Sequence, residues 1–268
     1  MFSQISKFKT MRALRIIPVL AVLAPVGAAE LNGQAREFLL GTPQFTVVVR
    51  GGYSVPRLGG GGDTQSLWDF TKQHLTVGNR DFAGSHIMAE LGIRGSERID
   101  LVVALGHSPT SVLSEFRGWE GDDGLPITQT TNFTTTPLTA GIKAYLKPRG
   151  RTIGSHVWVP RTFNPFVGIA GGMVWYSFDQ YGEFVDYESL EIFYEDFWSE
   201  ERAPTVHLFT GMDINISGRL MLTGEARYGF AKGPFEVRDS GYSDFIGFPK
   251  LDLSGLNVSL GVGLRIWR

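Results

Sequence analysis

Residues 256–266 read LNVSLGVGLRI, and this stretch decides the fold because its polarity alternates at every position. The even positions are all apolar: Leu256, Val258, Leu260, Val262, Leu264 and Ile266. The odd positions between them are small or polar: Asn257, Ser259, Gly261, Gly263 and Arg265. A β-strand directs successive side chains to opposite faces. Such a strand fits a small barrel, with a lipid-facing apolar wall outside and a narrow lumen inside.

The same period of two recurs in seven earlier segments, which makes eight predicted strands. These segments are 45–53, 86–94, 99–106, 138–146, 165–178, 206–215 and 219–230. Segment 165–178 is apolar on both faces, so its pattern does not show which face points outward. The sequence therefore predicts an all-β fold, an eight-stranded antiparallel up-and-down transmembrane β-barrel.

The predicted connections alternate between short and long. Gly95-Ser96-Glu97 and Ser217-Gly218 are tight turns, and 148–163 is a longer basic link. The long connections are approximately 55–81, 107–135, 179–203 and 231–250. Outer-membrane barrels have short periplasmic turns and longer outer loops. We therefore expect all four long connections at the outer end and both ends of the barrel at the periplasmic end.

The N-terminal residues have the pattern of an export signal. Four basic residues precede an apolar run from Ile16 to Val26, which is followed by the small residues Gly27-Ala28-Ala29. This predicts a signal peptide over 1–29, with Met1 or Met11 as the start. A membrane anchor is the alternative, but the run is shorter than the roughly 20 residues that span a bilayer. We expect an N-terminal periplasmic segment over 30–43 and a barrel domain over 44–268.

Composition excludes several classes of function. The chain has no cysteine, which excludes disulfides and thiolate metal sites. Removal of residues 1–29 leaves 21 basic and 27 acidic residues, a formal charge of −6. An acidic exported chain is a poor nucleic-acid binder. We therefore expect no nucleic-acid partner, no cofactor and a monomeric chain.

Aromatic residues gather near the predicted strand ends. They are Phe45, Tyr53, Phe166, Trp175, Tyr176, Phe178, Tyr228, Phe230 and Trp267. Tyr and Trp prefer the membrane interface, so the pattern favours aromatic girdles around the barrel. The alternative is a soluble lipocalin-like carrier, in which the apolar face of 256–266 would point inward.

Three motifs in order resemble one family. Asn164-Pro165-Phe166-Val167-Gly168, Gly218-Arg219-Leu220 and the 256–266 strand are similar to the outer-membrane β-barrel domain family that includes the OmpA membrane domain and OmpW. The resemblance covers 44–268. It implies a bacterial outer-membrane location, with outer-membrane lipid, lipopolysaccharide and the outer-membrane assembly machinery as partners. Such barrels often end on a lipid-facing aromatic residue, whereas here Ile266 holds that phase and Trp267 does not.

The inward phase of the predicted strands carries charges of both signs. These are Arg50, Glu90, Asp100, Lys143, Asp213, Glu225, Arg227 and Arg265, accompanied by His86 and His207. Side chains fill the interior of an eight-stranded barrel, and buried charges must pair. We predict a mixed-sign network that closes the lumen. A gated channel or proton path is the alternative.

The third long connection is strongly acidic. Residues 179–201 hold nine acidic residues, no basic one and seven aromatic ones. The candidate surface-interaction residues are Glu183, Asp186, Tyr187, Glu188, Glu191, Tyr194, Glu195 and Trp198. Such a segment could adhere to a surface or bridge to lipopolysaccharide through divalent cations. The alternative is a solvated loop whose aromatic residues pack on the rim, with a short helix over 188–200.

These observations predict a non-enzymatic outer-membrane barrel that contributes to envelope integrity or surface interaction through its outer loops. One alternative is an OmpW-like channel for small apolar molecules, which the apolar residues Val167, Ile169, Met173 and Val174 favour. The other is a lipid A-modifying hydrolase at His107-Ser108, where adjacent strand residues would point to opposite faces. The sequence assigns no catalytic, cofactor-binding or metal-ligating residue.

Overall fold

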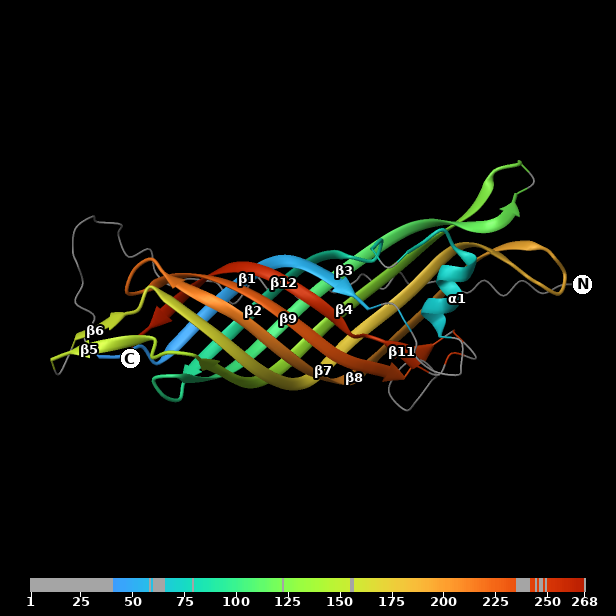
Figure 1. Cartoon of the computed structure of the whole chain (residues 1–268). Coiled ribbons are helices and arrows are strands. Elements are labelled where there is room, and N and C mark those ends of the chain that lie inside the picture. Colours follow the sequence, from blue (N-terminus) through green and yellow to red (C-terminus); the bar gives the residue numbers. More distant parts are fainter. Residues whose placement is uncertain are drawn as a thin grey trace, which may run out of the picture. The chain divides into compact units, whose positions relative to one another are not determined.

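A computed structural model describes residues 41–57, 59, 66–78, 80–121, 123–154, 157–234, 242–243, 245, 248 and 250–267. The predicted signal peptide and almost all of segment 30–43 lie outside the described residues. Figure 1 shows the course of the chain.

Eight long strands close into an antiparallel ring (Figure 1). They are β1 (Phe45–Pro56), β2 (Gly84–Arg94), β3 (Ile99–Glu120), β4 (Pro126–Tyr145), β7 (Phe163–Val185), β8 (Ile192–Asn215), β9 (Leu220–Pro234) and β12 (Gly255–Ile266). Each strand pairs with the next in this order, and β12 pairs with β1 from Phe45↔Ile266 to Pro56↔Gly255. The predicted eight-stranded up-and-down barrel is confirmed. We call the end with Phe45 and Ile266 the inner end and the opposite end the outer end.

The apolar faces of the strands point outward. On β12, Ser259, Gly263 and Arg265 are buried, whereas the even positions are 39–74% exposed. Leu260 is the most exposed of these, at 74%. A lipocalin-like carrier would hold this face inside, so the burial pattern excludes that alternative. The exposed apolar side chains of all eight strands form a belt that suits lipid.

The burial pattern also resolves the phase of β7. Phe166, Tyr176 and Phe178 lie inside the barrel, so their assignment to an outer girdle is wrong. Their segment is apolar on both faces, so the sequence pattern does not show which of its residues face the lumen. Glycines make room for such rings, because a Cβ at Gly211 would lie 2.5 Å from the Phe166 ring.

Four strands continue past the apolar belt at the outer end (Figure 1). We call residues 108–120, 126–135, 177–185 and 192–201 of β3, β4, β7 and β8 the outer wall. Most of 107–135 and 179–203 is therefore strand rather than loop, and 188–200 is not a helix, because β8 begins at Ile192. Outward Thr, Ser, Asn and acidic residues replace the apolar ones here, so the apolar signal fades although Thr favours strands.

The first long connection folds over the outer mouth. Ser66 caps the N-terminus of helix α1 (Leu67–His74), because its hydroxyl accepts a hydrogen bond from the Asp69 amide at 3.2 Å. Trp68 is fully buried, and its indole nitrogen donates to the Asp252 carbonyl at 3.1 Å. No helix in the described part of the chain is long and apolar enough to cross a membrane.

Trp68 belongs to a set of buried side chains that we call the outer cluster. Its ring meets those of Phe82, Phe133 and Phe178 edge-on, with centroids 5.1–5.4 Å apart. The remaining members are Leu67, Leu75, Val77, Val112, Phe116, Ile127, Val174, Tyr176, Val185, Ala203, Ala231 and Leu251. The outer cluster thus joins the 66–82 segment to inward side chains of the outer wall.

Short strands complete the two ends. At the inner end β5 (Gly150–Ile153) pairs with β6 (Val157–Pro160) inside the basic link. At the outer end β11 (Lys250–Asp252) pairs with β9, and β10 (Tyr242–Ser243) pairs with Ser199 and Glu200 of β8.

The outward face of β12 gives a direct test of the membrane belt. Leu260→Arg is expected to lower the free energy of unfolding in lipid by about 2–4 kcal/mol, because a charge near the bilayer midplane must leave water. The matched control is Leu113→Arg, since Leu113 is 71% exposed on the outer wall, beyond the belt. Urea unfolding in lipid vesicles measures both. Equal losses in the two variants would contradict the placement of the belt.

Candidate functional site

Five charged side chains from four strands meet inside the barrel, and we call them the charge network. They are Arg50 (β1), Glu90 (β2), Lys143 (β4), Glu225 and Arg227 (β9). Each is at most 3% exposed. A Cβ at Gly261 would lie 2.8 Å from Cγ of Arg50, so β12 leaves space for that side chain.

Glu90 is the centre of the charge network. Its Oε2 lies 2.9 Å from Arg50 Nη1 and 3.5 Å from Arg227 Nη2, and its Oε1 accepts a hydrogen bond from Lys143. Glu225 joins the same guanidinium groups, with 2.7 Å from Oε1 to Arg227 Nε and 3.4 Å from Oε2 to Arg50 Nη2. Two buried carboxylates therefore hold three buried cations.

Aromatic rings line the same level of the lumen. Lys143 Nζ lies 4.5 Å from the centroid of the Phe166 ring, and Arg227 Cζ lies 4.3 Å from that of Phe209. Contacts of a cation with a ring face are favourable when both are desolvated. These rings therefore pack against the cations of the charge network.

The other three predicted interior charges are buried but lie outside the charge network. Asp100 accepts a hydrogen bond from Arg149 at 2.7 Å, and Asp213 accepts one from the Tyr145 hydroxyl at 2.9 Å. Arg265 donates to the Gly218 carbonyl at 3.3 Å, which places it at the inner end. The charge network thus joins five of the eight predicted residues.

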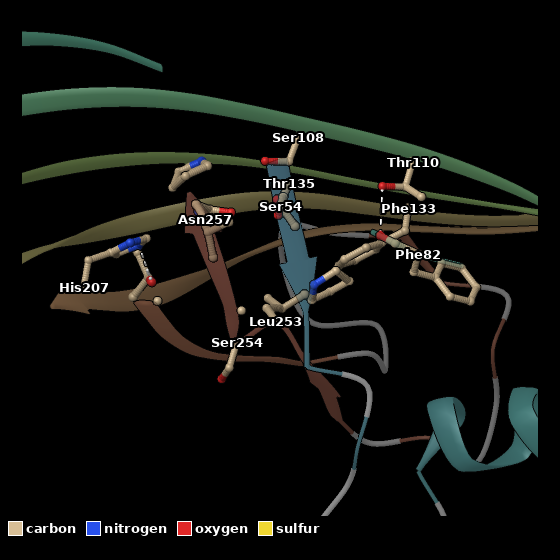
Figure 2. Close-up of a pocket in the computed structure, with 16 residues that line it drawn as sticks. Ser54, Phe82, Ser108, Thr110, Phe133, Thr135, His207, Leu253, Ser254 and Asn257 are labelled. Atoms are coloured by element: carbon tan, nitrogen blue, oxygen red, sulfur yellow. Dashed lines mark hydrogen bonds between the residues drawn. The ribbon is translucent and has the colours of Figure 1, made fainter. Parts of the chain in front are cut away.

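A cavity lies outward of the charge network, because Ser54 lines it further along β1 than Arg50, and Phe82 and Phe133 of the outer cluster also line it. Figure 2 shows the residues around this cavity. Polar and apolar residues both line it, and they come from β1, β3, β4, β7, β8, β9 and β12 and from Phe82, Leu253 and Ser254. The labelled polar residues are Ser54, Ser108, Thr110, Thr135, His207, Ser254 and Asn257. The Thr205 hydroxyl lies 2.9 Å from Nε2 of His207. Such a chamber suits ordered water.

A histidine–serine pair stands beside this cavity, and the sequence did not reveal it. His86 Nδ1 lies 2.8 Å from the Ser108 hydroxyl, and both residues are buried. The two are 22 positions apart and meet only through the pairing of β2 with β3. His107 points outward instead, with Nδ1 3.0 Å from the Thr136 hydroxyl.

This pair does not make a hydrolytic site in the described residues. A nucleophilic serine needs a base that a third group orients. His86 Nε2 has no hydrogen-bond partner among the described atoms, so no carboxylate holds the ring. Where the structure describes the chain, it also contains no group of three or more potential metal ligands.

The candidate surface-interaction residues lie on the hairpin of β7 and β8. Tyr187, Tyr194 and Trp198 are 55%, 70% and 38% exposed. Glu183 accepts a hydrogen bond from the Thr128 amide at 3.2 Å, which ties the hairpin to β4. The acidic candidates Asp186, Glu188, Glu191 and Glu195 are all exposed.

Asp186 shapes the tip of this hairpin. Its carboxylate accepts hydrogen bonds from the Glu188 amide and the Ser189 hydroxyl, both at 2.9 Å, and Leu190 has φ of 60°. The hydrogen bond from the Glu188 backbone amide is the main cause that lowers the pKa of Asp186. Asp186 is therefore ionised and fixed in a turn.

Comparison with solved structures finds barrels of the same kind. The chain is similar to OprG of Pseudomonas aeruginosa at 13% identity, covering 85% of this chain and 99% of that one, with a TM-score of 0.44. The fold of this chain is a small eight-stranded antiparallel β-barrel with an outward apolar belt, as its own strand pairing and burial show. Neisserial surface protein A matches at 10% identity over 83% of this chain and 97% of that one, with a TM-score of 0.41.

Ail of Yersinia pestis, solved with the heparin analogue sucrose octasulfate, matches at 8% identity. It covers 84% of this chain and 100% of that one, with a TM-score of 0.40. No protein-family model matches this chain, and no curated protein matches its sequence. These likenesses concern the fold, and the residue roles proposed below rest on this chain's own geometry.

Proposed function

We propose that this protein is a non-enzymatic barrel of the bacterial outer membrane that acts in surface interaction through its outer wall. The observation that carries the proposal is the continuation of four paired strands past the apolar belt. A rigid sheet costs less ordering entropy on binding than a flexible loop. The barrel anchors this sheet, and the sheet presents the binding residues.

The chemistry of the hairpin supports this role. Large exposed aromatic side chains such as Tyr194 stand among acidic ones, and Tyr and Trp are the residues that most often dominate binding energy. Acidic side chains favour partners that carry cations. Lipopolysaccharide with bound calcium is such a partner, because carboxylates and sugar phosphates can share the ion.

The channel for apolar molecules has less support. Val167 and Ile169 are 45% and 52% exposed on the lipid-facing side, and Val174 is buried in the outer cluster. The fifth long strand therefore does not supply an apolar path through the lumen. The predicted closure of the lumen by the charge network, together with the buried outer cluster, also argues against such a path.

A shortened hairpin tests the proposed surface. Register pairs Glu183 with Tyr194, so replacement of 184–193 by Asn-Gly leaves a two-residue turn between paired strands. We expect the shortened chain to fold and to lose binding to purified lipopolysaccharide in calcium. The double variant Tyr194→Ala with Trp198→Ala is expected to weaken binding about 30-fold, as for loss of about 2 kcal/mol at a binding hot spot.

The control removes the other exposed tip. Asp123 and Leu125 are exposed in the turn between β3 and β4, and substitution of both by Ser should leave binding unchanged. Equal binding by the intact and shortened chains, with calcium and with EDTA, would remove the hairpin from the proposal.

A further inference from the structure

The inner end of the barrel carries a concentration of positive charge that the outer wall does not explain. We call residues 94–98, 146–162 and 216–219 the inner rim. They contain seven basic residues and one acidic residue, Glu97. The basic residues are Arg94, Arg98, Lys147, Arg149, Arg151, Arg161 and Arg219. This end therefore has the opposite charge to the acidic hairpin at the outer end.

Hydrogen bonds join the three segments of the inner rim into one surface. The Arg149 amide donates to the Glu97 carbonyl at 3.3 Å, and its guanidinium donates to the Ser96 carbonyl at 3.2 Å. The Asn215 amide donates to the Thr162 carbonyl at 2.8 Å. The backbone segments that carry the basic residues are thus held side by side.

Most of this charge faces solvent. Arg149 is the exception, because it is buried and forms an ion pair with Asp100. Arg94 is half-buried beside Trp158, with 6.0 Å from its Cζ to the ring centroid. The exposed cations are Arg98, Lys147, Arg151, Arg161 and Arg219.

The exposed cations also adjoin the edge of the apolar belt. Arg98 precedes Ile99, which is 44% exposed, and Lys147 follows Leu146, which is 60% exposed. Apolar side chains in the belt bind acyl chains, while the next residues along the strand reach the headgroup layer. Long basic side chains are suited to this position because their stems cover apolar surface while their charges stay in water.

We infer that the inner rim binds anionic phospholipids of the leaflet that faces the inner end of the barrel. Charge complementarity supports this partner, since each Lys or Arg near an anionic membrane surface contributes attraction. The phosphate of a phosphatidylglycerol headgroup accepts hydrogen bonds from Arg and Lys and carries the opposite charge. Four rim cations hold such headgroups beside the belt: Arg98, Lys147, Arg151 and Arg161.

The proposal is tested with the full chain in nanodiscs that contain phosphatidylethanolamine with or without phosphatidylglycerol. The quadruple variant is Arg98→Gln, Lys147→Gln, Arg151→Gln and Arg161→Gln, which keeps the backbone bonds of the rim and leaves Arg149 with Asp100. Native mass spectrometry counts the lipids that stay bound to the protein after it is released from the nanodiscs. We expect the wild type to retain phosphatidylglycerol over phosphatidylethanolamine by at least about tenfold, and the variant to lose this preference.

The matched control neutralises four exposed cations at the outer end: Arg57→Gln, Arg80→Gln, Arg202→Gln and Lys250→Gln. This control should keep the preference for phosphatidylglycerol. Heat-modified migration on a gel shows that each variant is folded. A folded rim variant with an unchanged preference would overturn the proposal. Loss of binding to peptidoglycan sacculi without loss of phosphatidylglycerol would also overturn it, because it would assign the rim to a different anionic partner.

Discussion

Replacement of Glu90 by glutamine is expected to lower the free energy of unfolding by about 3–5 kcal/mol. The neutral side chain leaves Arg50 and Arg227 paired with Glu225 alone, and it removes the carboxylate that pairs with the buried Lys143. The loss measures mainly the cost of uncompensated buried cations, and only in part the strength of the ion pairs. Urea unfolding of the full chain in lipid vesicles measures the difference. The folded fraction at each urea concentration is read from the different gel migration of the folded and the unfolded barrel.

Two further variants separate this cause from a general loss of packing. Glu90→Gln combined with Lys143→Met removes one charge of each sign, and it should recover part of the lost stability. Glu97→Gln neutralises an exposed carboxylate and should change the unfolding free energy by less than about 0.5 kcal/mol. A double variant less stable than Glu90→Gln alone would contradict the compensation argument.

The membrane belt could be predicted from the sequence because lipid imposes a strict rule on each strand. Every outward position must be apolar, so Leu256 to Ile266 carries the signal at each second residue. The outer wall escapes that rule, since water contacts its outward face. In the outer wall the outward residues, such as Thr134, are polar, so no apolar outward face marks the strand. The sequence pattern therefore predicts loops in this region.

The alternation of inward and outward residues predicts which charged residues lie inside the barrel, but it does not predict which of them contact one another. It selected residues that the structure buries, such as Glu90 and Glu225, because a charged residue on an otherwise apolar strand must face the lumen. It could not show that Arg265 lies apart from them. The stagger between neighbouring strands decides which interior side chains meet. The alternation of polarity along each strand does not reveal that stagger. The His86–Ser108 pair was missed for the same reason.

The second large effect is expected at Trp68, whose ring packs the 66–82 segment against the outer wall. Trp68→Ala should lower the unfolding free energy by about 3–5 kcal/mol, because it leaves a cavity among three rings and removes the bond to Asp252. It should also free the segment for tryptic cleavage at Lys72 and Arg80. Trp198→Ala is the matched control, since that ring is 38% exposed, and it should cost much less.

The same variant separates two ways of closing the lumen. The charge network lies inward of the cavity and does not contact Trp68, so planar bilayers with Trp68→Ala should remain without a large, steady conductance. A conductance in Trp68→Ala but not in the wild type would mean that the 66–82 segment alone seals the barrel. A large, steady conductance in the wild type would contradict a closed lumen. Full protection of Lys72 from trypsin in a folded Trp68→Ala chain would contradict the anchoring role of the ring.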